Sequence, residues 1–397
     1  MALAAVGLLA LSGPLPGTAG RPPPAGNQDT IEVWVCAVPL DTGAPVYQPS
    51  PLRLDLDPAT VADQLDEHVR RYFAALSHGR YVPRFVAGGV LSLRADEGGE
   101  ECMARAQDGS RRTADVVLAV ANAEHRADAH GGLGNPGARC AQADAPCPAS
   151  VSRRGAYVGA SDFHPAWGPL PAFDLVEHEL GHTLGWPHSG SPAGEYDSAL
   201  DMMSDSTAPR AVFPDEHHAG GTLGVNLADA GWIPASDVVR VRREGTASTY
   251  RISRSAGPAG LRLLELPLTA DRFLTVELLT ADGLDRHLPE SGIAITWVDA
   301  SAAACGTPCD PLRRRHIAQR SAPPYTDLLQ AGEDPWSGHG WRVEVDSVDD
   351  GTAVVTVAPG PAAPARPAEP GRRSRAHASG QLTACASSNV GSRVHQM

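Results

Sequence analysis

Alternating apolar and polar positions indicate that strands and helices share the first half of the chain. The successive patterns are a strand at 31–35, a helix at 58–76, and strands at 81–86, 90–93, 114–120 and 155–163. Residues 131–150 are rich in glycine, proline and cysteine and are expected to form a loop. The order of elements predicts a sheet with helices, followed by a helix that carries two histidines.

The second half of the chain changes to short β patterns. Residues 225–233 are expected to form a helix that closes on Gly231. Strand-like runs then lie at 238–241, 249–252, 261–266, 273–279, 293–298, 341–345 and 352–357. Turn residues separate several of these runs, for example Asp282-Gly283 and Asp350-Gly351, which favours an antiparallel β-sandwich.

The most informative stretch is residues 178–188, which read H-E-x-x-H-x-x-G-x-x-H. His178 and His182 are four residues apart, so on a helix they lie on one face and can share a metal ion. Gly185 can take a positive φ and turn the chain, which brings back His188 as a third nitrogen ligand. Three neutral imidazoles leave one tetrahedral position open for water, as in catalytic zinc sites, and Glu179 is placed to act as the base on that water. The alternative is a buried helix whose histidines have no role in metal binding.

This motif resembles that of the metzincin metalloproteases. The resemblance implies an α+β fold, with a metzincin catalytic domain built from a twisted mixed sheet and an active-site helix, followed here by the β-sandwich-like domain. It also implies a methionine turn beneath the zinc, and it puts that methionine at Met203, with Met202 as the off-by-one alternative. Residues 226–233 and 275–299 resemble most closely the gametolysin-like and immune-inhibitor-A-like branches.

Within this resemblance, the last strand before the zinc helix is an exposed edge that pairs with an extended substrate. The resemblance suggests Ala156 to Ser161 for that role. The chain departs from astacins and serralysins because Asp205 stands where they have an additional tyrosine ligand. It departs from adamalysins because Ser189, and not aspartate, follows the third histidine. No tyrosine ligand is therefore expected.

The expected domain organisation has four parts. Residues 1–26 are interpreted as a signal peptide, 27–236 as the zinc protease domain, 237–358 as the β-sandwich-like domain and 359–397 as a disordered tail. The apolar run near the N-terminus is too short to cross a bilayer, and no other run is long enough. These features predict a secreted monomer with no membrane insertion.

Seven cysteines in an exported chain predict disulfides with one cysteine left over. Cys140 with Cys147 and Cys305 with Cys309 are local candidates. Cys36 with Cys102 would then be the long-range pair, leaving Cys385 in the tail. A free buried thiol is the alternative for Cys36.

Other polar residues give weaker signals. Five further histidines could line the cleft or form a second metal site: His125, His130, His164, His217 and His218. Histidines in such stretches are more often exposed or hydrogen-bonded loop residues, which is the interpretation adopted for them. Five acidic residues follow the third histidine and could bind Ca²⁺ through their carboxylate oxygens: Asp197, Asp201, Asp205, Asp215 and Glu216. Their spacing matches no calcium-loop pattern, so they are interpreted as solvent-exposed loop charges. Asp201 is the one that we expect to brace a zinc ligand.

Composition narrows the function further. A net charge of −13 argues against nucleic acid as a partner. The prediction is a secreted endopeptidase that uses one Zn²⁺ ion and hydrolyses proteins or peptides, with Glu179 as general base. The alternative is a non-catalytic protein on a metzincin scaffold that binds glycans or proteins. Aromatic residues make up only 5% of the chain, with no dense aromatic stripe in the β half for stacking on sugars, which weakens that alternative.

Overall fold

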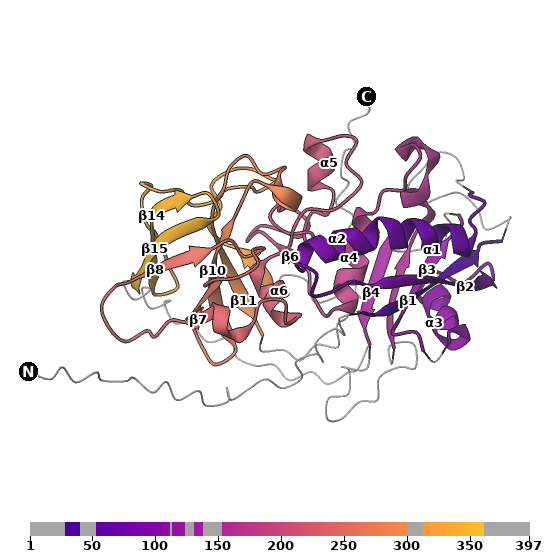
Figure 1. Cartoon of the computed structure of the whole chain (residues 1–397), viewed down its shortest axis with the longest axis horizontal. Helices are drawn as coiled ribbons and strands as arrows, with labels where there is room; N and C mark the ends of the chain where they lie inside the picture. Colours follow the sequence, from indigo (N-terminus) through magenta and orange to yellow (C-terminus); the bar gives the residue numbers. More distant parts are fainter. Residues whose placement is uncertain are drawn as a thin grey trace, which may run out of the picture. The chain divides into compact units, whose positions relative to one another are not determined.

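Three β-sheets and several helices make up the ordered architecture (Figure 1). The computed structural model describes residues 28–39, 53–111, 113–123, 131–137, 153–300 and 313–360. The stretch interpreted as a signal peptide (1–26), residues 361–397 of the predicted tail (359–397) and the four cysteines Cys140, Cys147, Cys305 and Cys309 lie outside these ranges. None of the helices within them is long and apolar enough to cross a membrane.

The first sheet has five strands in the order β2-β1-β3-β5-β4. Its members are β1 (Thr30–Ala37), β2 (Arg84–Ser92), β3 (Val116–Ala121), β4 (Gly132–Pro136) and β5 (Arg154–Val158). Four of these strands are parallel to one another, and β4 is antiparallel to β5. The two patterns predicted at 81–86 and 90–93 form one strand, β2. The mixed sheet confirms the predicted fold class for this half.

Both faces of this sheet are covered, which explains why β3 is apolar throughout. Val116, Leu118 and Val120 face a core that includes α1 and α2, whereas Val117 and Ala119 face a second core beneath α3. Figure 1 shows α1 and α2 on one side of the sheet and α3 on the other. The α-helices are α1 (Pro58–Glu67), α2 (Val69–Leu76), α3 (Gly99–Gly109), α4 (Asp174–Thr183), α5 (Ala208–Val212) and α6 (Gly224–Asp229).

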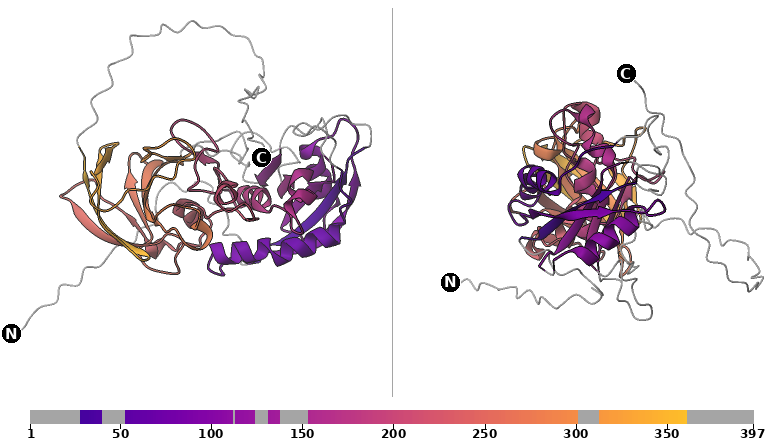
Figure 2. Two further views of the ribbon diagram at one scale, coloured as in Figure 1. Left: turned by 90° about the horizontal axis from the view of Figure 1, so that it is seen from above. Right: turned by 90° about the vertical axis from the view of Figure 1, so that its right-hand side faces the viewer.

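The single helix predicted at 58–76 is divided at His68 into α1 and α2, which continue nearly in line (Figure 2). Asp57 caps α1 by accepting a hydrogen bond from the Thr60 amide. Gly79 follows α2 with φ +74, as expected of a residue that ends a helix.

Helix α3 was not predicted from the sequence. Its buried face consists of short or sulfur-containing side chains, including Cys102, Met103 and Ala106, so the apolar periodicity is weak. The helix starts where Glu101 accepts a hydrogen bond from the Gly98 amide at 2.9 Å. A disulfide joins Cys102 to Cys36 on β1, which confirms the predicted long-range pair.

The prediction that Ala156 to Ser161 form the edge strand is wrong. Strand β5 lies between β3 and β4, so β4, and not β5, is the edge strand at this end of the described sheet. Strand β4 falls in the stretch predicted to be a loop, because its sequence is dominated by glycine and proline. The glycines are needed because α4 lies against the strand: an added Cβ at Gly132 would overlap the Glu179 carboxylate, and one at Gly134 would overlap His182 Cβ.

The second half forms two sheets with one apolar core between them, which confirms the sandwich-like class. The six-stranded sheet runs β6-β12-β11-β10-β9-β7 and the four-stranded sheet runs β13-β14-β15-β8. The strands are β6 (Ser189–Gly190), β7 (Val238–Arg240), β8 (Ser248–Ser253), β9 (Leu263–Pro267), β10 (Arg272–Leu279), β11 (Gly292–Asp299), β12 (Arg314–His316), β13 (Trp336–Gly338), β14 (Trp341–Asp349) and β15 (Thr352–Pro359). Most pairs are antiparallel, but β6–β12 and β7–β9 are parallel.

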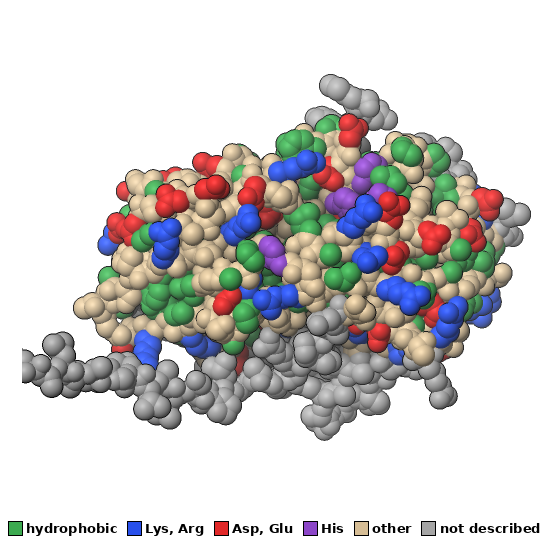
Figure 3. Space-filling view, viewed as in Figure 1, with side chains coloured by type: hydrophobic (Ala, Val, Ile, Leu, Met, Phe, Trp, Pro, Cys, Tyr) green, Lys and Arg blue, Asp and Glu red, His purple; other side chains and the backbone are tan. Residues whose placement is uncertain are grey.

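Short 3₁₀ helices complete the connections. They are η3 (Ala160–Phe163), η4 (Pro165–Trp167), η5 (Ala235–Asp237) and η6 (Gly283–Asp285). On the face of the molecule in Figure 3, arginine and acidic side chains are interspersed and do not gather in patches of one sign.

Candidate metal centre

Three histidines converge where α4 ends. His178 and His182 lie one turn apart on α4, and Gly185 turns the chain with φ +89 so that His188 returns to them. One ligand atom from each histidine lies within 4.8 Å of the others, and all three side chains are buried. In the described part of the chain this is the one cluster of its kind. The geometry expected from the sequence is therefore present.

Backbone carbonyls orient two of these imidazoles. His178 Nδ1 lies 2.7 Å from the carbonyl oxygen of Met202, and His182 Nδ1 lies 2.7 Å from that of Trp186. An Nδ1–H that donates to a carbonyl leaves the Nε2 lone pair free for a metal ion. His182 Nε2 and His188 Nε2 approach to 2.9 Å, so two nitrogen lone pairs can point at one position.

Burial keeps the three imidazoles neutral. It lowers the pKa of His178 to about 4 and that of His188 to about 3. The pKa of His182 lies well below its usual value because of burial and the two neighbouring histidines. Neutral imidazole is the form that binds zinc, so at neutral pH a zinc ion would not have to displace a proton from these three side chains.

Glu179 is the buried carboxyl beside these histidines. Its side chain is 4% exposed, and its Oε2 atom has no hydrogen-bond partner among the residues that the structure describes. Burial, and then the charge of Asp162, raise its pKa well above the usual value. A buried polar atom without a partner is rare in folded proteins. Three neutral nitrogens beside such a carboxyl fit a zinc ion with an associated water.

Two consecutive methionines lie beneath the site, and their contacts differ. Met203 lies against the zinc helix, since an added Cβ at Gly181 would come within 2.6 Å of its sulfur. Met202 supplies the carbonyl that orients His178, and its sulfur accepts a hydrogen bond from the Tyr72 hydroxyl at 3.0 Å. Met203, the residue predicted for the methionine turn, is thus the methionine that lies against Gly181 of α4.

Asp201 is fully buried and contacts neighbours of the ligands. Its carboxylate accepts hydrogen bonds from the hydroxyls of Ser189 at 2.6 Å and Thr222 at 2.7 Å, and from the Met203 amide at 3.2 Å. It therefore ties the residue after the third histidine to the methionine turn, and none of these three hydrogen bonds involves an imidazole of the metal site. The five acidic residues considered as possible calcium ligands in the sequence do not come together as a metal-binding cluster within the described ranges.

Three of the histidines considered for a second site, His164, His217 and His218, make hydrogen bonds of their own. His218 Nδ1 lies 2.6 Å from the buried Glu177, and its ring stacks on Tyr72 and Phe173. His217 Nδ1 lies 2.9 Å from a backbone carbonyl. His164 Nδ1 accepts a hydrogen bond from a backbone amide at 2.9 Å. His125 and His130 lie outside the described ranges.

One residue beside the three histidines was not predicted from the sequence. Tyr196 lies in the loop after the third ligand, and its hydroxyl oxygen is 3.1 Å from His188 Nε2. The expectation that there is no additional tyrosine ligand rested on Asp205, which stands where astacins and serralysins have that tyrosine, and it did not consider Tyr196. The available signal was an aromatic residue in an otherwise small and acidic loop between the third histidine and the methionine turn.

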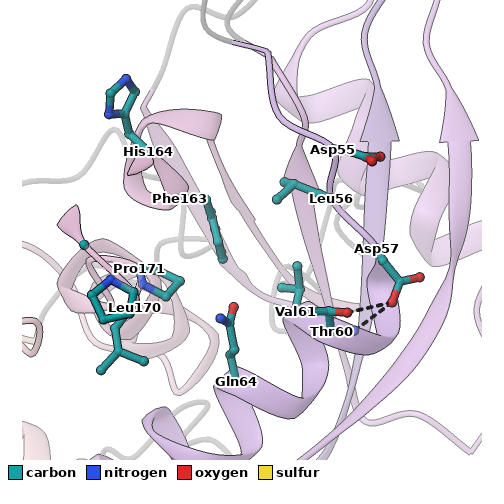
Figure 4. A pocket seen from close by; sticks show the side chains of 12 residues that line it. Asp55, Leu56, Asp57, Thr60, Val61, Gln64, Phe163, His164, Leu170 and Pro171 are labelled. Atoms are coloured by element: carbon teal, nitrogen blue, oxygen red, sulfur yellow. Dashed lines mark hydrogen bonds between the residues drawn. The ribbon is translucent and has the colours of Figure 1, made fainter. Parts of the chain in front are cut away.

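A cavity of about 240 Å³ lies apart from the three histidines (Figure 4). It is lined by the start of α1, including Thr60 and Gln64, and by the segment from Phe163 to Pro171. None of the predicted metal ligands contributes to it, so it is not the metal site.

Residues 96–189 match the family model described as metallo-peptidase family M12B, reprolysin-like. The match covers α3, β3 to β5 and α4 and ends one residue past His188. No curated protein and no solved structure matches the chain. Together with the three-histidine arrangement, the family match supports a zinc metallopeptidase with a metzincin-like site.

Proposed function

We propose that the chain is a secreted zinc endopeptidase that hydrolyses extracellular proteins. The observation that carries the proposal is the buried group of His178, His182 and His188 beside Glu179. The disulfide between Cys36 and Cys102 supports an oxidising compartment, because such bonds rarely persist in the cytosol.

The chemistry divides between the metal and the chain. A zinc ion held by the three imidazoles would polarise the scissile carbonyl and lower the pKa of its bound water to about 7. Glu179 would accept the proton of the attacking water and pass it to the leaving amine. The buried surroundings of Glu179 raise its pKa, which suits a group that must hold that proton between the two steps. Met203 supports the floor of the site through its contact with Gly181.

Strand β4 is the element best placed to hold an extended substrate. Of the two edge strands of the described sheet, β2 and β4, it is β4 that contacts α4, since Gly132 and Gly134 lie against Glu179 and His182. An extended peptide that pairs with such an edge gains main-chain hydrogen bonds whatever its side chains are. β4, and not Ala156–Ser161, is therefore the strand that we propose for pairing with the substrate.

The proposal is tested by zinc content and proteolysis together. Purified wild-type protein and Glu179→Gln are analysed for zinc by mass spectrometry and incubated with casein and gelatin. We expect one zinc ion per chain in both proteins and cleavage by the wild type alone. His188→Ala is the metal-site control and should lose zinc.

Two other results would contradict the proposed protease activity or the proposed metal site. Zinc in both proteins without cleavage in either would favour the binding protein on a metzincin scaffold. The absence of zinc from wild-type protein that has been refolded with zinc would refute the metal site itself.

A further inference from the structure

Tyr196 places a phenol beside the third metal ligand. Its hydroxyl oxygen lies 3.1 Å from His188 Nε2 and 3.2 Å from His188 Nδ1. Its ring centroid lies 4.8 Å from that of His188 and 6.3 Å from that of His178. The phenol is therefore close to two of the three imidazoles. Because imidazole nitrogen binds zinc at about 2.0–2.1 Å, the hydroxyl oxygen would lie within roughly 5 Å of a bound ion.

The residue lies on the accessible side of the site. Tyr196 is 51% exposed, whereas each of the three histidines is at most 7% exposed. A substrate must reach the metal from the side that solvent can reach, so the phenol lies on its path. A half-exposed aromatic residue is not needed for the hydrophobic core.

The backbone at Tyr196 adopts a conformation that is unfavourable for this residue type. Its φ is +54, in the left-handed region where bulky side chains are uncommon. Such conformations are energetically unfavourable and persist where the surrounding structure enforces them, often at functional sites.

Several contacts enforce this conformation. Next in the chain, Asp197 accepts hydrogen bonds from the Ser191 amide at 2.7 Å and from its hydroxyl at 2.6 Å. The amide of Tyr325 donates to the Asp197 carbonyl at 2.9 Å, and the Ala199 amide donates to the Tyr325 carbonyl at 3.1 Å. The loop that carries Tyr196 is thus fixed by a residue of the β-rich half.

Strand pairing fixes the start of the same loop. β6, which follows His188 directly, pairs in parallel with β12 of the β-sandwich. The loop between the third ligand and the methionine turn is therefore held at both ends by the C-terminal half.

We propose that Tyr196 is a second catalytic residue, whose hydroxyl donates a hydrogen bond to the oxygen of the scissile carbonyl as that oxygen becomes negatively charged. The inference rests on the proposed function. In the step, the water oxygen bonds to the carbonyl carbon while the carbonyl π electrons move to oxygen. Glu179 takes the proton from the water and delivers it to the amine nitrogen as the C–N bond breaks. Tyr196 keeps its own proton throughout.

The expected effect follows from measured oxyanion contacts in other enzymes. Removing one donor of this kind lowers kcat about 10²–10³-fold. Tyr196→Phe retains the ring and removes only the hydroxyl, so the fold and the metal ligands are preserved. Tyr250→Phe, on β8 of the four-stranded sheet, is the matched control.

The experiment uses the full zinc-loaded chain and a quenched fluorescent peptide built from a casein bond that the wild type cleaves. For Tyr196→Phe we expect kcat to fall about 100-fold with KM and zinc affinity little changed. A second readout is binding of a peptidyl phosphonate that mimics the tetrahedral state, which should weaken by a similar factor. Binding of the cleaved product peptide should not change.

The outcomes separate this inference from the proposed function. If the wild type cleaves nothing and equals Glu179→Gln, the proposed function fails and the role of Tyr196 fails with it. If the wild type cleaves and Tyr196→Phe has the same kcat and phosphonate affinity, only the role of Tyr196 is refuted. A loss of zinc affinity in Tyr196→Phe would make the phenol a metal ligand and would equally overturn its role as a donor.

Discussion

Replacing Glu179 by glutamine should stabilise the metal-free protein at neutral pH. The carboxyl is buried, its Oε2 atom has no partner within the described ranges, and its pKa is raised well above the usual value. For a carboxyl whose pKa is higher in the folded state, the folded state holds more protons than the unfolded state. The free energy of unfolding then falls as pH rises from the unfolded pKa of about 4.3 towards the folded pKa. One such group contributes up to about 1.4 kcal/mol per pH unit over that window.

Glutamine has nearly the same shape but does not ionise, so the variant lacks this pH-dependent loss. Glu177 and Glu277, whose pKa values burial raises to about 7, titrate in both proteins and cancel in the comparison. The two proteins should therefore have similar stabilities near pH 4, and the variant should become the more stable one as pH rises.

The assay is urea denaturation in the presence of EDTA at unit steps from pH 4 to pH 8. Glu100→Gln, which removes an exposed carboxylate on α3, controls for the loss of one negative charge. A constant difference between wild type and Glu179→Gln across this range would refute the reasoning, because Glu179 would then be solvated or paired in the folded state. Zinc should narrow the difference, since a nearby cation favours the ionised carboxylate. The same variant should lose about 10²–10⁴-fold in kcat through the loss of its general base.

Three further predictions concern residues that support the site. Gly132→Ala should lower kcat/KM at least about tenfold with zinc retained, because the new Cβ overlaps the Glu179 carboxylate; unchanged casein cleavage would show that β4 can shift at little cost. Asp201→Ala should lower the free energy of unfolding by about 2–6 kcal/mol, because it leaves two buried hydroxyls unpaired at about 1–3 kcal/mol each; an unchanged midpoint of urea denaturation would contradict this. Replacing Cys36 and Cys102 by serine should cost about 4 kcal/mol for residues 66 apart, and an unchanged denaturation midpoint would contradict it.

The sequence alone was sufficient for the metal ligands because their arrangement is local. His178 and His182 share a helical face through their spacing of four residues, and Gly185 supplies the positive φ that returns His188. Backbone geometry over eleven residues determines these positions whatever surrounds them. The long strands and the change to a β-rich second half were predictable because apolar periodicity is a strong signal. Cys36 with Cys102 was the pair left after the two local candidates had been matched, and the disulfide in the structure joins these two residues.

Three features were decided only by the tertiary structure, because contacts between distant segments create them. Strand β4 consists largely of glycine and proline, and it is a strand because α4 requires small residues there and β5 supplies its hydrogen bonds. Helix α3 has a weak apolar periodicity and is stabilised by its contacts with the sheet. Tyr196 reaches His188 because Tyr325, far along the chain, holds its loop. The local sequence therefore determines which atoms can bind the metal, and long-range packing determines what lies beside them.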